Sequence, residues 1–80
     1  MKTEYKYIRF DDYSNPTQKT GRWMCFNRKH GSFLGEVKWY QGWRQYCFAP
    51  VGRTVFSKGC LDDIGDFIQQ LMGARRRRRR

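Results

Sequence analysis

Aromatic rings and cations gather in one stretch of the sequence, Leu34 to Pro50, which reads LGEVKWYQGWRQYCFAP. It holds the rings of Tyr40 and Trp43 close to the positive charges of Lys38 and Arg44. Flat rings stack on nucleobases and cations attract phosphate, so these residue types are typical of noncovalent binding. Exposed hairpins also use paired Trp and Tyr side chains for stability alone, at roughly 0.2 to 1 kcal/mol per pair.

The residue pattern in this stretch predicts a β-hairpin whose loop is Gln41-Gly42. In that register, Tyr40 lies opposite Trp43 and Val37 lies opposite Tyr46. Because strand side chains alternate, the two faces of the hairpin differ. The core face is expected to hold Val37, Trp39, Tyr46 and Phe48, with Arg44 at the tip, and the outer face Glu36, Lys38, Tyr40, Trp43, Gln45 and Cys47.

Residues suited to catalysis or metal binding are sparse. The sole histidine, His30, lies in a polar turn, and three aspartates fit the exposed side of a helix. Three widely spaced cysteines lack the CxxC spacing of zinc sites, and we interpret them as packing thiols. The sequence therefore predicts a protein that is not an enzyme and has no metal and no cofactor.

The chain has 80 residues and a formal net charge of +10. A chain of this size forms one small core. The remaining 74 residues, without Arg75 to Arg80, carry 11 basic and 7 acidic side chains, a net charge of +4. We predict a single compact domain over residues 1–73 and an arginine tail over 74–80 that is disordered or an appended tag, with a native phosphate-attracting arm as the alternative.

The order of the predicted elements defines an α+β fold: an antiparallel β-meander of three to five strands packed against one C-terminal α-helix. Strands are expected over Thr3 to Phe10 and Arg22 to Asn27, then in the hairpin, with a short one at Thr54 to Phe56. Asp11 to Gly21 and Arg28 to Ser32 are expected to be a loop and a turn. The register of the Arg22 to Asn27 strand stays open, because one residue of slip exchanges its two faces.

From Leu61, apolar residues recur at helical spacing, and Gly73 is expected to end the helix. We expect Asp62 and Asp63 in the first helical turn, and Gly65 where the helix approaches the sheet closely. The buried stripe is expected to comprise Leu61, Ile64, Phe67, Ile68, Leu71 and Met72. The exposed side would carry Asp62, Asp63, Asp66, Gln69 and Gln70. Large side chains expected to supply most of the core are Trp23, Phe26, Trp39, Phe48, Phe56 and Phe67.

The acidic side of this helix would repel phosphate, so the sheet is the better binding surface. In layout, a sheet backed by one helix resembles plant ethylene-response type DNA-binding domains and the amino-terminal domain of some transposon integrases, but no matching motif is present. A closer resemblance covers LGEVKWYQGWRQYCFAP and TVFSKGCLDDIGDFI, about Leu34 to Leu71. This pattern is similar to a small group of uncharacterised bacterial and phage-borne proteins. The resemblance implies a compact intracellular domain and a mobile-element setting, with no established activity.

We therefore expect a small cytoplasmic nucleic-acid-binding accessory protein with no membrane association. Tyr40 and Trp43 are the expected stacking groups. The expected phosphate contacts are Arg22, Arg28, Lys29, Lys38 and Arg44. The alternative is a phage or mobile-element protein that binds and modulates a host protein through the same aromatic face, and a homodimer through a sheet edge is a third reading.

Overall fold

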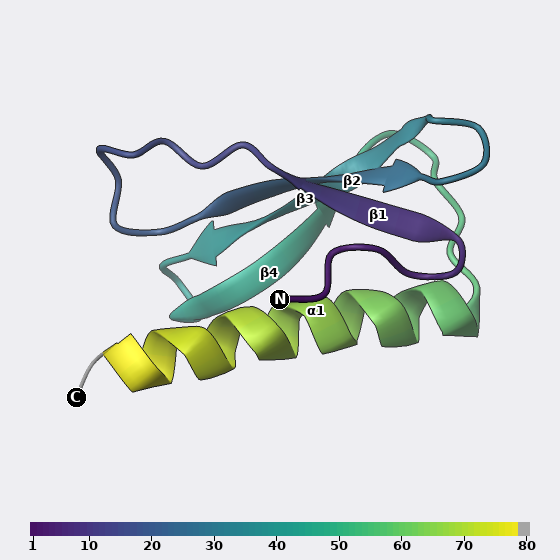
Figure 1. Ribbon diagram of the computed structural model, residues 1–80. Helices are drawn as coiled ribbons and strands as arrows, with labels where there is room; N and C mark the ends of the chain where they lie inside the picture. The colour runs from purple at the N-terminus through teal and green to yellow at the C-terminus, as the bar shows by residue number, and fades with distance from the viewer. Residues whose placement is uncertain (79–80) are drawn as a thin grey trace.

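The computed structural model describes residues 1–78 and shows the predicted α+β architecture. Its four strands form one antiparallel meander with the order β1-β2-β3-β4. The strands are β1 (Ile8–Asp12), β2 (Arg22–Asn27), β3 (Phe33–Tyr40) and β4 (Gln45–Pro50), and the helix is α1 (Lys58–Arg78). α1 runs along one face of the sheet, and no other helix covers the opposite face in the part of the chain described (Figure 1).

The register of β2 places Cys25 in the core, with 0% of its surface exposed. Trp23 shares this face and meets the Phe67 ring edge-on at 5.3 Å between centroids. Burial raises the pKa of the Cys25 thiol to about 12, so this cysteine is a packing residue at neutral pH. Met24 and Phe26 consequently face away from α1, which resolves the register that the sequence left open.

The first strand begins later than predicted, at Ile8, because the preceding residues fold back along it. The Phe10 N–H donates to the Thr3 carbonyl at 2.8 Å, and Glu4 forms a bridge with Arg9. This reversal carries Tyr5 into the core, where its hydroxyl donates to Asp66 of α1 at 2.7 Å. Burial, together with the bond to this carboxylate, holds the pKa of Tyr5 well above its usual range. A single strand from Thr3 to Phe10 was therefore a wrong prediction.

The core is centred on Phe67, which is fully buried and stacks on Phe10 at 4.0 Å between ring centroids. Of the aromatics predicted for the core, Phe67 is buried, and Trp23, Trp39, Phe48 and Phe56 pack against the buried cluster. Phe26 was assigned wrongly. It lies on the outer face, against Phe33 and under the guanidinium of Arg9.

α1 is longer than the predicted helix at both ends. Ser57 caps its start by accepting a hydrogen bond from the Cys60 N–H at 3.2 Å, so the first turn holds no acidic residue. The expected placement of Asp62 and Asp63 in that turn was wrong, as was the burial of Leu61, which is 55% exposed.

The carboxyl end of α1 passes through Gly73 and continues to Arg78, so the predicted helix end was also wrong. The expected tail thus lies partly in this helix, and residues 79 and 80 fall outside the described residues. No strand forms at Thr54 to Phe56, which belongs to the irregular connection between β4 and α1.

Gly65 is exposed, and a Cβ added there would meet nothing within 4 Å. Close approach to the sheet therefore does not explain this glycine. Gly65→Ala is expected to raise the free energy of unfolding by about 1 kcal/mol, because alanine loses less backbone entropy in a helix. Urea unfolding measures the change. Gly35→Ala is the matched opposite case, because its Cβ would lie 2.6 Å from the Ala49 carbonyl oxygen and should destabilise the sheet.

Candidate functional site

The β3–β4 hairpin has a longer loop than predicted. Tyr40 pairs with Gln45, and Val37 pairs with Phe48 rather than with Tyr46. The loop therefore comprises residues 41–44, and Arg44 adopts a left-handed backbone conformation with φ of 53°. The predicted register was wrong by two positions, and a shift of two keeps every strand side chain on its predicted face.

Tyr40 and Trp43 form an exposed aromatic pair at the tip of this hairpin. Their rings meet edge-on at 5.2 Å between centroids, with 49% of Tyr40 and 69% of Trp43 exposed. Gly42 lets the loop close over Tyr40, since a Cβ there would lie 2.9 Å from the ring. The loop thus holds two rings together while leaving much of their surface in solvent.

Two cations flank a carboxylate on the outer face beside this pair. Arg22 and Lys38 are paired across β2 and β3, and both contact Glu36, with nitrogen–oxygen distances of 2.5 and 3.2 Å. Both cationic side chains are 52% exposed, whereas that of Glu36 is 14% exposed. Glu36 therefore fixes the position of both cations while leaving them accessible to a ligand.

We call Arg22, Lys38, Tyr40, Trp43 and Arg44 the outer-face site. Arg22, Lys38 and Tyr40 project from the face that α1 does not cover, and Trp43 and Arg44 lie in the adjoining loop. Asp62 and Asp66 are exposed on α1, on the other side of the sheet (Figure 1). The sheet therefore separates these carboxylates from the cations.

Arg28 and Lys29 are not brought together with the outer-face site. They follow the end of β2, whereas Arg22 begins it, a separation of roughly 20 Å at the rise of a β-strand. Arg28 also has a structural contact, because its guanidinium donates to the Tyr5 carbonyl at 2.8 Å. The role of these two residues in binding stays a prediction.

Arg75 is a neighbour of the hairpin that the sequence analysis missed. Its guanidinium lies over the Trp39 ring at 4.0 Å from the centroid, and the Trp39 indole N–H donates to Gln41 at 2.9 Å. The contact depends on α1 continuing past Gly73. The sequence signal that could have indicated this contact is the spacing of Leu71 and Arg75, which are four residues apart and therefore lie on one face of the helix.

The ion cluster makes stability depend on pH. Hydrogen bonding from Arg22, with a further contribution from Lys38, holds the pKa of Glu36 below its ordinary value of 4.5, against the effect of burial. A carboxyl whose pKa is depressed on folding stabilises the fold above its unfolded pKa, and that contribution disappears as the pH falls through the folded pKa.

Glu36→Gln is expected to lower the free energy of unfolding at pH 7, because it removes the charge that pairs with Arg22 and Lys38. The loss should be only about 1 kcal/mol, since both cations are half-exposed and solvent weakens the ion pairs. The variant should also lose less stability than the parent between about pH 5 and about pH 3. Urea unfolding across this range measures both effects. Asp62→Asn is the control, an exposed carboxylate whose ion pair with Lys58 lies outside this cluster. Equal acid destabilisation of the Glu36 variant and the parent would refute this role.

Within residues 1–78, no group of three His, Cys, Asp or Glu side chains is placed to hold a metal ion. None of the helical segments described has the length and apolar character needed to span a bilayer.

Fold and site together define a small α+β protein with a four-stranded meander, one covering helix, and an aromatic and cationic outer face. The chain is 31% identical over 71 residues to the "Uncharacterized 9.3 kDa protein" of Acholeplasma phage L2, across 89% of this chain and 91% of the relative. It belongs to the same family as that phage protein. No protein-family model and no solved structure matches the chain.

Proposed function

We propose that this protein is an accessory protein of a phage or mobile element that binds nucleic acid through the outer-face site. The observation that carries the proposal is the exposed Tyr40–Trp43 pair, which lies on the same face as two half-exposed cations and across the sheet from the carboxylates of α1. Similarity to a phage protein supports the accessory role, and the residue chemistry supports the ligand class.

The geometry favours unpaired bases. Trp43 is 69% exposed, so its ring has free surface on which a base can stack. Base–aromatic stacking contributes roughly 1 to 3 kcal/mol per base and requires a base that is not enclosed in a duplex. Arg22 and Lys38 would contact the adjacent phosphates. The proposed ligand is therefore a single strand, bound with little sequence preference and without catalysis.

Charge removal tests the proposed phosphate contacts. The double variant Lys38→Gln with Arg44→Gly should bind a single-stranded oligonucleotide more weakly, and its slope of log affinity against log salt should fall by about 1.4, or 0.7 per phosphate contact. Glycine suits position 44 because of the left-handed backbone there. Fluorescence anisotropy at several salt concentrations gives both quantities.

Arg53→Gln with Lys58→Gln is the matched control, because it removes the same charge from exposed positions outside the site. An equal change of slope in the two double variants would show that net charge alone governs binding and would refute the proposed site.

The rival function is modulation of a host protein through the same aromatic pair, since Trp and Tyr are frequent interface anchors. It would be favoured if the charge and ring variants left oligonucleotide affinity unchanged.

A homodimer through a sheet edge also remains a prediction. The described edges are partly occupied: residues 3–5 lie along β1, and the Tyr46 N–H of β4 contacts the Met72 sulfur at 3.5 Å.

A further inference from the structure

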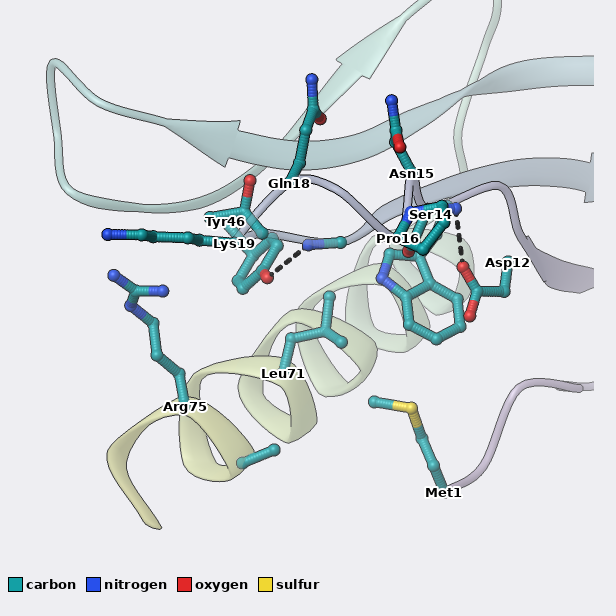
Figure 2. A pocket seen from close by; sticks show the side chains of 14 residues that line it. Met1, Asp12, Ser14, Asn15, Pro16, Gln18, Lys19, Tyr46, Leu71 and Arg75 are labelled. Carbon is teal, nitrogen blue, oxygen red and sulfur yellow. Dashed lines mark hydrogen bonds between the residues drawn. The ribbon is translucent and has the colours of Figure 1, made fainter. Parts of the chain in front are cut away.

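A second feature with binding chemistry lies between the sheet and α1, apart from the outer-face site. A cavity of about 540 Å³, partly open to solvent, is lined by the β1–β2 loop, the first residues of β2 and β4, and the carboxyl half of α1 (Figure 2). Cavities of this size hold small-molecule ligands. Its apolar wall includes Met1, Pro16 and Leu71.

The cavity lining contains hydrogen-bond donors that lack partners, beside Ser14, Asn15, Gln18 and Thr20, whose side chains both donate and accept. The indole Nε1 of Trp23 and the Nε of Arg75 are buried and have no hydrogen-bond partner among the described residues. Both groups donate and cannot accept. The Tyr46 hydroxyl oxygen already accepts from the Gly21 N–H at 2.9 Å, so its own proton is directed to no acceptor in the described chain.

The charged side chains in the cavity wall also favour an anionic ligand. Lys19 and Arg75 line it and extend to the same side of it in Figure 2. Lys19 is exposed and forms no ion pair within the described residues. Asp12 is the one lining carboxylate, and one of its oxygens already accepts the Ser14 N–H at 2.8 Å. Unpartnered donors and a net positive wall complement an anion that has several acceptor oxygens.

We propose that this cavity binds a phosphate group carried by a small molecule up to the size of a mononucleotide. Trp23, Arg75 and Lys19 would donate to the phosphate oxygens, and the apolar wall would contact the remainder of the ligand. The site does not depend on the outer-face function, because none of its lining residues belongs to that surface.

The indole N–H resonance of Trp23 in the full-length chain reports on this site directly. Titration with inorganic phosphate, at an ionic strength held constant with chloride, should shift the Trp23 resonance saturably. The Trp43 indole is the internal control in the phosphate titration, because it lies in the hairpin loop outside the cavity, whereas Arg75 lies over the Trp39 ring. A nucleoside monophosphate should also shift the Trp23 resonance, and the matching nucleoside should not.

Substitutions inside and outside the cavity sharpen the test. Lys19→Gln should weaken phosphate binding about tenfold, since it removes a charged donor from an exposed loop, whereas Lys58→Gln, at the amino end of α1, should have no effect. Gly21→Ala should abolish the response, because the new methyl would lie 2.9 Å from Trp23 Nε1. The Tyr40→Ala, Trp43→Ala double variant should respond as the parent does.

Four results would overturn the inference: no shift with phosphate, an equal shift with chloride, equal responses to nucleoside and nucleotide, or unchanged affinity in Lys19→Gln. Loss of the response in the double variant would place the ligand on the outer face and would also overturn it.

Discussion

Phe67→Ala is expected to lower the free energy of unfolding by about 3 to 5 kcal/mol, the largest single effect in this fold. Phe67 has 0% of its surface exposed, stacks on Phe10 at 4.0 Å and meets Trp23 edge-on at 5.3 Å. Alanine would remove both ring contacts and leave a cavity that α1 and the sheet cannot fill without moving. Urea unfolding followed by circular dichroism measures the loss.

Phe33→Ala is the matched control, because Phe33 is 40% exposed on the outer face. This substitution should lower the free energy of unfolding by about 1 kcal/mol or less. If Phe67→Ala does not fold, Phe67→Leu keeps most of the buried volume and should be destabilised by a smaller amount. Comparable losses for the alanine variants at positions 67 and 33 would contradict the assignment of the core.

The second large effect concerns binding. Removal of both hairpin rings in the Tyr40→Ala, Trp43→Ala double variant should weaken single-strand affinity by about a hundredfold, or about tenfold per ring lost. Each single variant should show part of the loss. Because Tyr40 is about half exposed and Trp43 is 69% exposed, the cost to folding should stay near 1 kcal/mol. Anisotropy titration and urea unfolding of the same samples separate the two effects.

Tyr7→Ala is the control for the ring variants. Tyr7 is 53% exposed and precedes β1, outside the outer-face site. Its removal should leave oligonucleotide affinity unchanged. An equal loss of affinity in Tyr7→Ala would mean that exposed aromatics contribute without regard to position, and the outer-face site would lose its basis.

The strand faces could be predicted from the sequence because side chains alternate with a period of two. Val37 and Tyr46 therefore lie on the core face although the loop length was wrong. The loop was harder to predict, because Arg44 adopts a left-handed conformation that residues with a Cβ seldom take. The Gln41-Gly42 pair is typical of a two-residue turn, whereas the observed pairing of Tyr40 with Gln45 leaves four residues in the loop.

Contacts between distant residues account for most of what the sequence did not predict. The fold-back before β1 is held by Tyr5 and Asp66, which are 61 positions apart. The helix passes through Gly73 at a cost of about 1 kcal/mol, and the stacking of Arg75 on Trp39 offsets part of it. No local pattern contains either contact. The same holds for the cavity between the sheet and α1, whose lining combines Met1, residues between 12 and 23, Tyr46 and residues between 71 and 75.

The central claim is that the outer face of the sheet, and not the arginine run, binds nucleic acid. The most direct measurement uses a variant in which Arg76 to Arg80 are replaced with glutamine and Arg75 is retained, because its guanidinium stacks on the Trp39 ring. This variant is titrated with a single-stranded oligonucleotide at several salt concentrations. We predict that salt-dependent binding persists and that adding Tyr40→Ala and Trp43→Ala weakens it by about a hundredfold. Complete loss of binding on neutralising the run, or binding indifferent to removal of the two rings, would contradict the claim.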